Sequence, residues 1–257
     1  MMPWLDYQLP YSITDVTSQT SQQYGRQIYY IQQQQRQYWL KYQAQDGHPQ
    51  YVQGFQQEQL IYNLPQMHQL TLPCLVLHPD QLTAFDLKAG TALLIQHAEP
   101  ILAYPPQHIL HAKNIIKQMI QAVLAWHDSG WLHADLKPKH FVRHHNQVYL
   151  IDFEHAQAVD TVSEYLNATP HYMAPELFHH HAKTIQSDIY ALGVIIYEWL
   201  SQQPLKAKSY REWAILHCQH SIFHLPLAYQ QLQPLLDQML QRQFKHRLAH
   251  LSLLKNL

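Results

Sequence analysis

Residues 131–141 read WLHADLKPKHF, and this stretch decides how the rest of the chain is interpreted. It sets one carboxylate, Asp135, two residues after His133 and two residues before Lys137, with Pro138 next in the chain. An aspartate in a turn often only caps that turn. This loop, however, lies between a predicted helix and a predicted hairpin, where a side chain can face a cleft. We therefore interpret Asp135 as a candidate catalytic group.

The segments around this loop have helical and strand patterns. Upstream, an apolar stripe at helical spacing predicts a long helix that begins after Pro106 and ends in the turn HDSG; its members are Ile115, Ile116, Met119, Ile120, Val123 and Leu124. Downstream, the runs FVRHH and QVYLIDF predict a small hairpin. Beyond Pro175, the run SDIYALGVIIYEWL is apolar nearly all round and predicts a buried helix.

The first hundred residues have a different character. The runs QIYYIQ from Gln27 and QYWLKYQ from Gln37 predict strands, and the glutamine run between them predicts a hairpin tip. One helix is predicted in VQGFQQEQLIYNLPQM, where Pro65 limits it. The sequence therefore predicts an α+β fold with a β-rich lobe over about 1–98, a hinge over about 96–106 and a mainly helical lobe over about 106–257. Together they form a single domain over 1–257.

The composition excludes several classes of protein. The chain has 257 residues, of which 47% are hydrophobic, which is ample for a packed core. Its formal net charge is −1, so no general electrostatic field attracts nucleic acid. The N-terminal residues resemble no targeting leader, and no apolar run reaches the ~20 residues of a membrane span. The two cysteines match no disulfide framework, so we expect a cytoplasmic protein.

Four motifs, taken in order, resemble those of the eukaryotic-type (Hanks-type) Ser/Thr protein kinases, with this chain as a divergent, bacterial-like member. They are HADLKP, IDFE, ATPHYMAPE and SDIYALGVIIYEWL, and the match spans nearly all of the chain. The resemblance implies a bilobal protein-kinase-like fold. It also implies ATP-dependent phosphoryl transfer to Ser/Thr hydroxyls of protein substrates, with ATP and Mg²⁺, or Mn²⁺ in its place, as cofactors.

Phosphoryl transfer needs carboxylates to orient the hydroxyl and hold the metal, and lysines to neutralise phosphate oxygens. The resemblance assigns Asp135 as the base, Lys137 as the cation at the γ-phosphate and Thr169 as their partner. It assigns the metal to Asp152 and to the position of His140. The implied nucleotide-binding residues are Lys41, which is the only lysine in the first 87 residues, Glu58 as the partner of Lys41, and Gly25, Gln96 and Ala98.

The chain departs from the family pattern at four places. Glu154 replaces the glycine of the family's DFG motif, and Trp39 occupies the position of a small alanine that contacts adenine. His140 replaces a metal-binding asparagine, although hard Mg²⁺ prefers oxygen ligands. The segment SQTSQQYGRQ offers a single glycine, Gly25, where the family has a glycine-rich loop. These departures leave two alternatives open: a pseudokinase that acts as a binding module, and a small-molecule kinase of the choline or aminoglycoside type, which the IDFE motif resembles.

Overall fold

The computed structural model describes residues 5–6, 9–161, 168–220 and 223–253. The chain divides into two compact units. Unit 1 contains residues 1–99 together with the short segment 152–154, and unit 2 contains residues 100–151 and 155–257. The return of residues 152–154 to unit 1 is a feature that no sequence pattern predicted.

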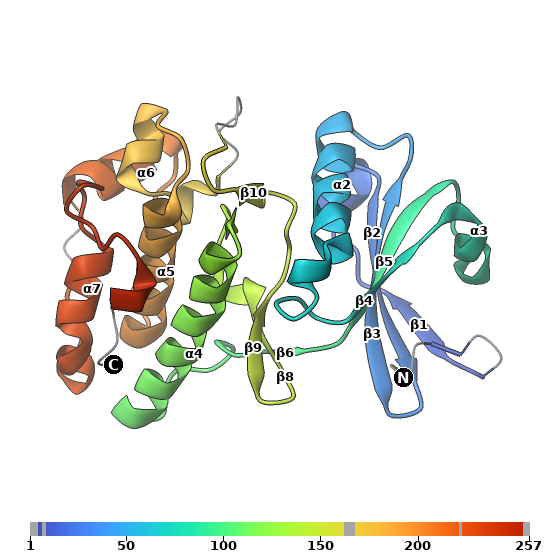
Figure 1. The fold of residues 1–257 in the computed structure, drawn as a ribbon, viewed down its shortest axis with the longest axis horizontal. Helices are drawn as coiled ribbons and strands as arrows, with labels where there is room; N and C mark the ends of the chain where they lie inside the picture. Colours follow the sequence, from blue (N-terminus) through green and yellow to red (C-terminus); the bar gives the residue numbers. More distant parts are fainter. Residues whose placement is uncertain (1–4, 7–8, 162–167, 221–222, 254–257) are drawn as a thin grey trace. The chain divides into compact units, whose positions relative to one another are not determined.

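Unit 1 is built on a five-stranded antiparallel sheet (Figure 1). The strand order is β1 (Ser12–Asp15), β2 (Arg26–Gln33), β3 (Arg36–Ala44), β5 (Gly90–Gln96) and β4 (Cys74–Leu77). The glutamine run forms the tight β2–β3 turn, in which Gln34 has a φ of 55°. The predicted hairpin tip is therefore confirmed.

The two faces of strand β3 have different neighbours, because side chains alternate across a strand. On one face, Tyr38, Leu40 and Tyr42 join a buried apolar cluster with residues of the neighbouring strands. On the other face lie Trp39 and Lys41, each partly buried. The predicted helix is α2 (Pro49–Asn63), which ends two residues before Pro65 and buries Phe55, Glu58, Ile61 and Tyr62. Short helices α1 (Gln19–Gln23) and α3 (Pro79–Leu82) complete this unit.

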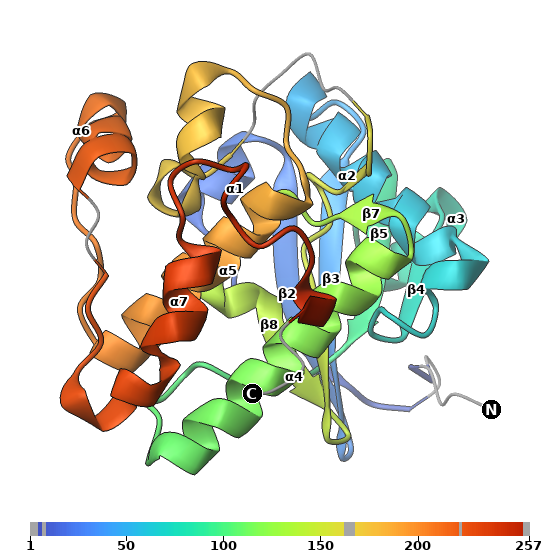
Figure 2. The ribbon, with the colours of Figure 1, turned by 60° about the vertical axis from the view of Figure 1, so that its left-hand side comes forward.

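Unit 2 is mainly helical (Figure 2). Its helices are α4 (Ile109–Asp128), α5 (Ile185–Ser201), α6 (Tyr210–Ile215) and α7 (Gln233–Met239). Helix α5 buries residues on all of its sides, as its sequence predicted. The predicted hairpin is the pair β8 (Phe141–His144) and β9 (Gln147–Leu150), in a sheet with β6 (Glu99–Pro100). Strand β7 (Trp131–Leu132) pairs with β10 (Gln157–Ala158).

The predicted α+β class and the predicted long elements are confirmed. The predicted domain limits stay a prediction. Among the residues that the structure describes, no helix is long and apolar enough to cross a membrane.

Candidate active site

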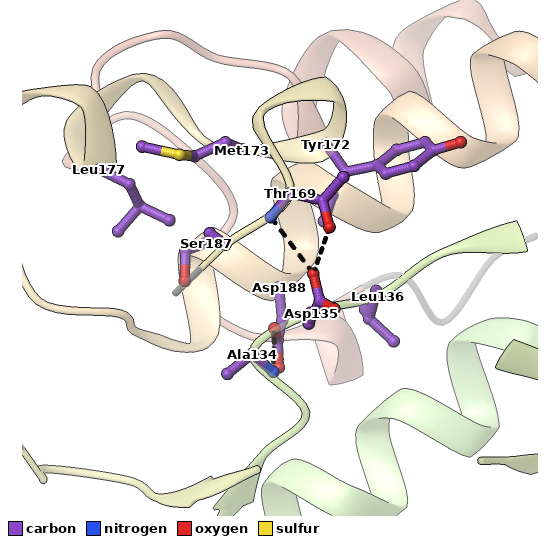
Figure 3. A pocket seen from close by; sticks show the side chains of 11 residues that line it. Ala134, Asp135, Leu136, Thr169, Tyr172, Met173, Leu177, Ser187 and Asp188 are labelled. Atoms are coloured by element: carbon purple, nitrogen blue, oxygen red, sulfur yellow. Dashed lines mark hydrogen bonds between the residues drawn. The ribbon is translucent and has the colours of Figure 1, made fainter. Parts of the chain in front are cut away.

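Asp135 lies in the loop between β7 and the short 3-10 helix Pro138–His140, and it is the centre of a polar cluster in unit 2. The Thr169 hydroxyl donates to Oδ1 of Asp135 at 2.8 Å, and the Thr169 amide donates to the same oxygen at 3.3 Å (Figure 3). The Lys137 Nζ lies 2.8 Å from Oδ2. Unit 2 therefore brings together the three residues that the sequence predicted to be catalytic.

Asp135 is ionised at neutral pH. Burial raises the pKa of this carboxyl, but Lys137, His155 and Thr169 together outweigh burial, with Lys137 the largest of the three, so the pKa is below its usual value. A third group contributes: Nε2 of His155 lies 4.0 Å from Oδ2 of Asp135. Sequence reasoning missed His155, because a histidine in a chain with 21 histidines carries no positional signal of its own.

The backbone of this loop is held by Asp188 in the first turn of α5. Its two carboxylate oxygens accept hydrogen bonds from the backbone amides of His133, at 2.9 Å, and Ala134, at 3.0 Å. The same carboxylate contacts Nε2 of His127 at 3.2 Å. Ala134 has a φ of 66°, a left-handed conformation that is uncommon for a residue with a Cβ. Such a backbone persists only when its surroundings fix it, and Asp188 supplies that constraint.

A second residue holds the backbone of Ala134 through its carbonyl. Lys183 is 8% exposed, and its Nζ donates to the Ala134 carbonyl at 2.8 Å. Beside this loop lies a small, partly open hollow, shown in Figure 3; its lining includes Asp135, Thr169, Tyr172 and Ser187. Lys183 was not predicted, because it follows a run of histidines that only suggested compositional bias.

A second charged cluster lies in unit 1. The Lys41 Nζ contacts Oε2 of Glu58 at 2.6 Å, Oδ1 of Asp152 at 3.2 Å and Oε1 of Glu154 at 2.6 Å. Burial lowers the pKa of Lys41, but the charges of Asp152, Glu154 and Glu58 outweigh burial and raise it above its usual range. Lys41 is therefore charged at neutral pH, and its predicted pairing with Glu58 is present.

The carboxylates of this cluster fit a divalent cation. One oxygen from each of Glu58, Asp152 and Glu154 lies within 4.8 Å of the others, and oxygens are the ligands that hard cations prefer. Asp152 has a φ of 69°, and its side chain is 32% exposed. Burial raises the pKa of Glu58 to about 7, which is the expected direction where three carboxylates share two cations, Lys41 and Arg26. Glu154 was not predicted as a member of this set.

His140 has a different setting. It belongs to unit 2, where it is 1% exposed and its ring stacks on that of His133 with centroids 5.3 Å apart. The described oxygen cluster of unit 1 does not contain it. A metal-binding role for His140 stays a prediction.

The remaining predicted nucleotide-binding residues belong to the sheet of unit 1 and its flanks. Gly25 directly precedes β2 with a φ of 77°, which favours glycine. A Cβ at Gly25 would also lie 2.9 Å from the Cα of Gly47, so the residue fits a close backbone approach. Gln96 ends β5, and Ala98 is buried just beyond it. Their roles stay predictions.

An aromatic group shares the sheet face of Lys41. We call Tyr30, Trp39 and His97 the aromatic trio. The Trp39 indole donates its N–H to Nδ1 of His97 at 3.0 Å, and the Tyr30 ring lies 5.2 Å from the Trp39 ring. His97 also contacts Glu99, with 3.0 Å between Nε2 and Oε1. The large side chain of Trp39 is therefore held in place by two neighbours.

Comparison with known proteins gives consistent matches. The family model of the protein kinase domain matches residues 91–256. A stretch of 157 residues, 59% of the chain, is 34% identical to the serine/threonine-protein kinase Nek3 of Mus musculus. A stretch of 127 residues, 47% of the chain, is 32% identical to the serine/threonine-protein kinase PrkC of Bacillus subtilis. These stretches cover 30% and 20% of the two relatives, so the chain matches less than a third of the length of either.

The solved structure of the Cydia pomonella granulovirus kinase PK-1 has the same fold. It matches with a TM-score of 0.67 over 94% of this chain and 91% of that chain. The two sequences are 16% identical, so this likeness concerns the fold alone.

Proposed function

Since this chain belongs to the protein kinase family, we propose that it transfers the γ-phosphoryl group of ATP to Ser/Thr hydroxyls of protein substrates. The observation that carries the proposal is the set of contacts around Asp135. Its Oδ1 accepts a hydrogen bond from the Thr169 hydroxyl at 2.8 Å, and its Oδ2 lies 2.8 Å from the Lys137 ammonium. Phosphoryl transfer depends on positioned charges more than on covalent chemistry, and this set supplies a positioned carboxylate beside a positioned ammonium group.

Asp135 has the role of orienting the attacking hydroxyl and accepting its proton. Its lowered pKa keeps the carboxylate ionised, so it can accept the hydrogen bond of a substrate alcohol. Thr169 and Lys137 fix its two oxygens, and Lys137 neutralises charge on the γ-phosphate. The double anchoring of the loop backbone by Asp188 and Lys183 supports this orientation.

Lys41 has the role of holding the α- and β-phosphates, and Glu58 orients it. The contact of 2.6 Å between them is a short, charge-assisted one inside unit 1. Gly25, Gln96 and Ala98 are proposed to line the nucleotide site. The aromatic trio narrows the space for the base, since Trp39 is fixed by His97 and Tyr30.

Asp152 is proposed to hold the divalent cation, with carboxylate oxygens of Glu58 and Glu154 nearby. When bound, the cation neutralises charge on the phosphates. We propose Mg²⁺ as the usual ion. If His140 contributes a nitrogen ligand, transfer should be faster with Mn²⁺ than with Mg²⁺, because imidazole suits Mn²⁺ better than Mg²⁺. Equal rates with the two ions would count against a metal-binding role of His140.

The proposed substrates are proteins, and the relatives named above, both called serine/threonine-protein kinases, support this. A pseudokinase is not favoured, because the acid and lysine positions needed for transfer are retained and in contact. The segment around Thr169, which small-molecule kinases lack, opposes the choline-kinase alternative. No nucleic-acid partner is proposed, since the net charge is −1.

The test is transfer of label from γ-labelled ATP to mixed protein substrates, in the presence of Mg²⁺ and of Mn²⁺. The parent chain and the Asp237→Ala variant, which removes an exposed carboxylate, should both transfer label. The Asp135→Ala variant should lose at least about 100-fold in rate, as expected for a general base. Absence of transfer by the parent with either ion would overturn the proposal and favour a binding role.

A further inference from the structure

Glu154, where the family has glycine, is built into unit 1 rather than exposed at its surface. Its side chain is 14% exposed, and Oε1 contacts both the Arg26 guanidinium and, at 2.6 Å, the Lys41 ammonium. Glu154 is the last residue of the segment 152–154, which also carries Asp152. A contact of Glu154 therefore bears on the position of the proposed metal-binding residue.

Arg26 is fitted to receive this carboxylate. It begins β2 and is 6% exposed, with Nε donating to Oε1 of Gln43 at 2.9 Å and a second nitrogen donating to the Tyr51 carbonyl at 3.4 Å. The guanidinium lies over the Phe55 ring, 5.0 Å from its centroid. A buried guanidinium is costly unless a carboxylate pairs with it, and Glu154 supplies that carboxylate.

Helix α2 carries a glycine, Gly54, at the point where Glu154 packs against it. A Cβ at Gly54 would lie 3.3 Å from both Cβ and Oε2 of Glu154, which is closer than ordinary packing. A side chain at Gly54 would therefore require Glu154 to shift by a few tenths of an ångström. The preceding residue, Phe153, is fully buried, and its ring lies 5.3 Å from that of Tyr62 in helix α2.

We propose that Arg26 and Glu154 form an ionic anchor that fixes residues 152–154 to unit 1, so that Glu154 is a positioning residue for Asp152 and Lys41. A glycine here would leave the segment backbone freer, whereas this chain replaces that freedom with a buried ion pair. The role of Asp152 rests on the proposed function; the anchor itself does not. Arg26 offsets part of the charge of Glu154, so that this carboxylate does not pair with Lys41 alone.

The anchor is tested by limited digestion with chymotrypsin. Cleavage after Phe153 requires release of the segment, whereas Leu227 is 92% exposed and gives a reference cleavage in every sample. The substitution Arg26→Met leaves the sequence around Phe153 unchanged. It should accelerate cleavage after Phe153 by about tenfold relative to cleavage after Leu227, because local opening becomes easier. Arg26→Lys, which keeps the charge, should restore most of the protection.

The matched control is Arg36→Met, which makes the same change at an exposed position at the start of β3. It should leave the cleavage ratio unchanged. The anchor would be overturned if Arg26→Met changed neither cleavage rate. It would also be overturned if Arg26→Met accelerated cleavage equally after Phe153 and after Leu227, since that result means that the whole fold is weakened. Because no step needs ATP, these results are independent of whether the chain transfers phosphate.

The positioning role has a separate readout in an active chain. Glu154→Gln should lower kcat by about tenfold and change the KM for ATP by less than about twofold, because it disturbs the reacting geometry rather than ground-state binding. The double variant Arg26→Met/Glu154→Gln avoids an unpaired buried charge and should unfold at a higher urea concentration than Glu154→Gln. A lower KM with unchanged kcat in Glu154→Gln would overturn the positioning role and mean that Glu154 competes with phosphate for Lys41.

Discussion

Trp39 is the residue whose side chain we propose to limit the nucleotide site most directly. Its indole is held by the hydrogen bond to His97 at 3.0 Å and by the Tyr30 ring, so it cannot move aside at low cost. We predict that Trp39→Ala lowers the KM for ATP by about threefold or more, because removing a fixed bulky group relieves steric exclusion of the base. Steady-state kinetics at varied ATP concentrations measure this change.

His97→Ala is the matched control for that variant. It removes the hydrogen-bond partner but keeps the indole, so it should lower the KM for ATP less than Trp39→Ala does. A KM that rises in Trp39→Ala would contradict the prediction. It would mean that the aromatic trio stacks on the base and contributes to binding.

Individual side chains differ in how far the sequence could predict them. The Lys41–Glu58 contact was predictable, because a single lysine in an aromatic strand and a glutamate in the next helix match a family pattern. The Arg26–Glu154 contact joins residues 128 positions apart. Glu154 stands where the family motif has glycine, and Arg26 belongs to none of the four motifs, so no local pattern in the sequence connects them. His155 and Lys183 were missed for the same reason.

At the scale of the element, the N-terminal turn of α5 holds the loop that carries Asp135. We predict that Asp188→Ala lowers the free energy of unfolding by about 2–5 kcal/mol, because it leaves the buried amides of His133 and Ala134 without their acceptor. The rate of transfer should fall as well, since Ala134 adjoins Asp135. Urea unfolding and initial rates measure the two effects.

Asp188→Asn tests whether the loss of stability comes from the missing acceptors, because the side-chain amide has one oxygen where the carboxylate has two. Its unfolding free energy should lie between those of the parent and Asp188→Ala. The exposed Asp237, in α7, provides a control: Asp237→Ala should change stability by less than about 0.5 kcal/mol, as is usual for surface positions. Equal stability of Asp188→Ala and the parent would contradict the assigned role of Asp188.

Long elements were predictable from periodicity, and the four-residue strands β8 and β9 from their apolar runs, but the two-residue strands were not. Helices α4 and α5, of 20 and 17 residues, contain several turns of apolar pattern, and β2 and β3 contain enough residues to show strand composition. Strands β7 and β10 have two residues each, which is too short for any alternation to appear. Their pairing depends on the tertiary fold around the loop of Asp135.

At the scale of the whole molecule, the 21 histidines make the response to acid a global property. His217 is fully buried. Its Nδ1 lies 2.9 Å from the Tyr190 hydroxyl and its Nε2 lies 3.1 Å from the His171 carbonyl, so the neutral ring satisfies both neighbours. Burial lowers the pKa of His217 to about 4 from the ordinary 6.5. The pKa of His133 is also lowered to about 4, by burial first and then by His140.

The direction of the pH effect follows from proton binding. Above pH 6.5 the His217 ring is neutral in both the folded and the unfolded chain, so it adds no pH dependence. Between 6.5 and 4 the unfolded chain binds a proton that the folded chain excludes, so stability falls as the pH falls. The raised pKa of Glu58 acts in the opposite sense, because the folded chain then binds a proton first. The contribution of His217 must therefore be measured as a difference between variants.

We predict that His217→Gln makes stability less sensitive to acid. The glutamine side chain can accept a hydrogen bond from the Tyr190 hydroxyl through its carbonyl and donate one to the His171 carbonyl through its NH₂ group, and it does not titrate. The loss of unfolding free energy between about pH 7 and about pH 5 should be smaller in this variant than in the parent by about 2 kcal/mol. Urea unfolding of both chains at the two pH values measures it, and Glu58 cancels because both chains retain it. Parallel losses in the two chains would show that His217 does not resist protonation in the folded state.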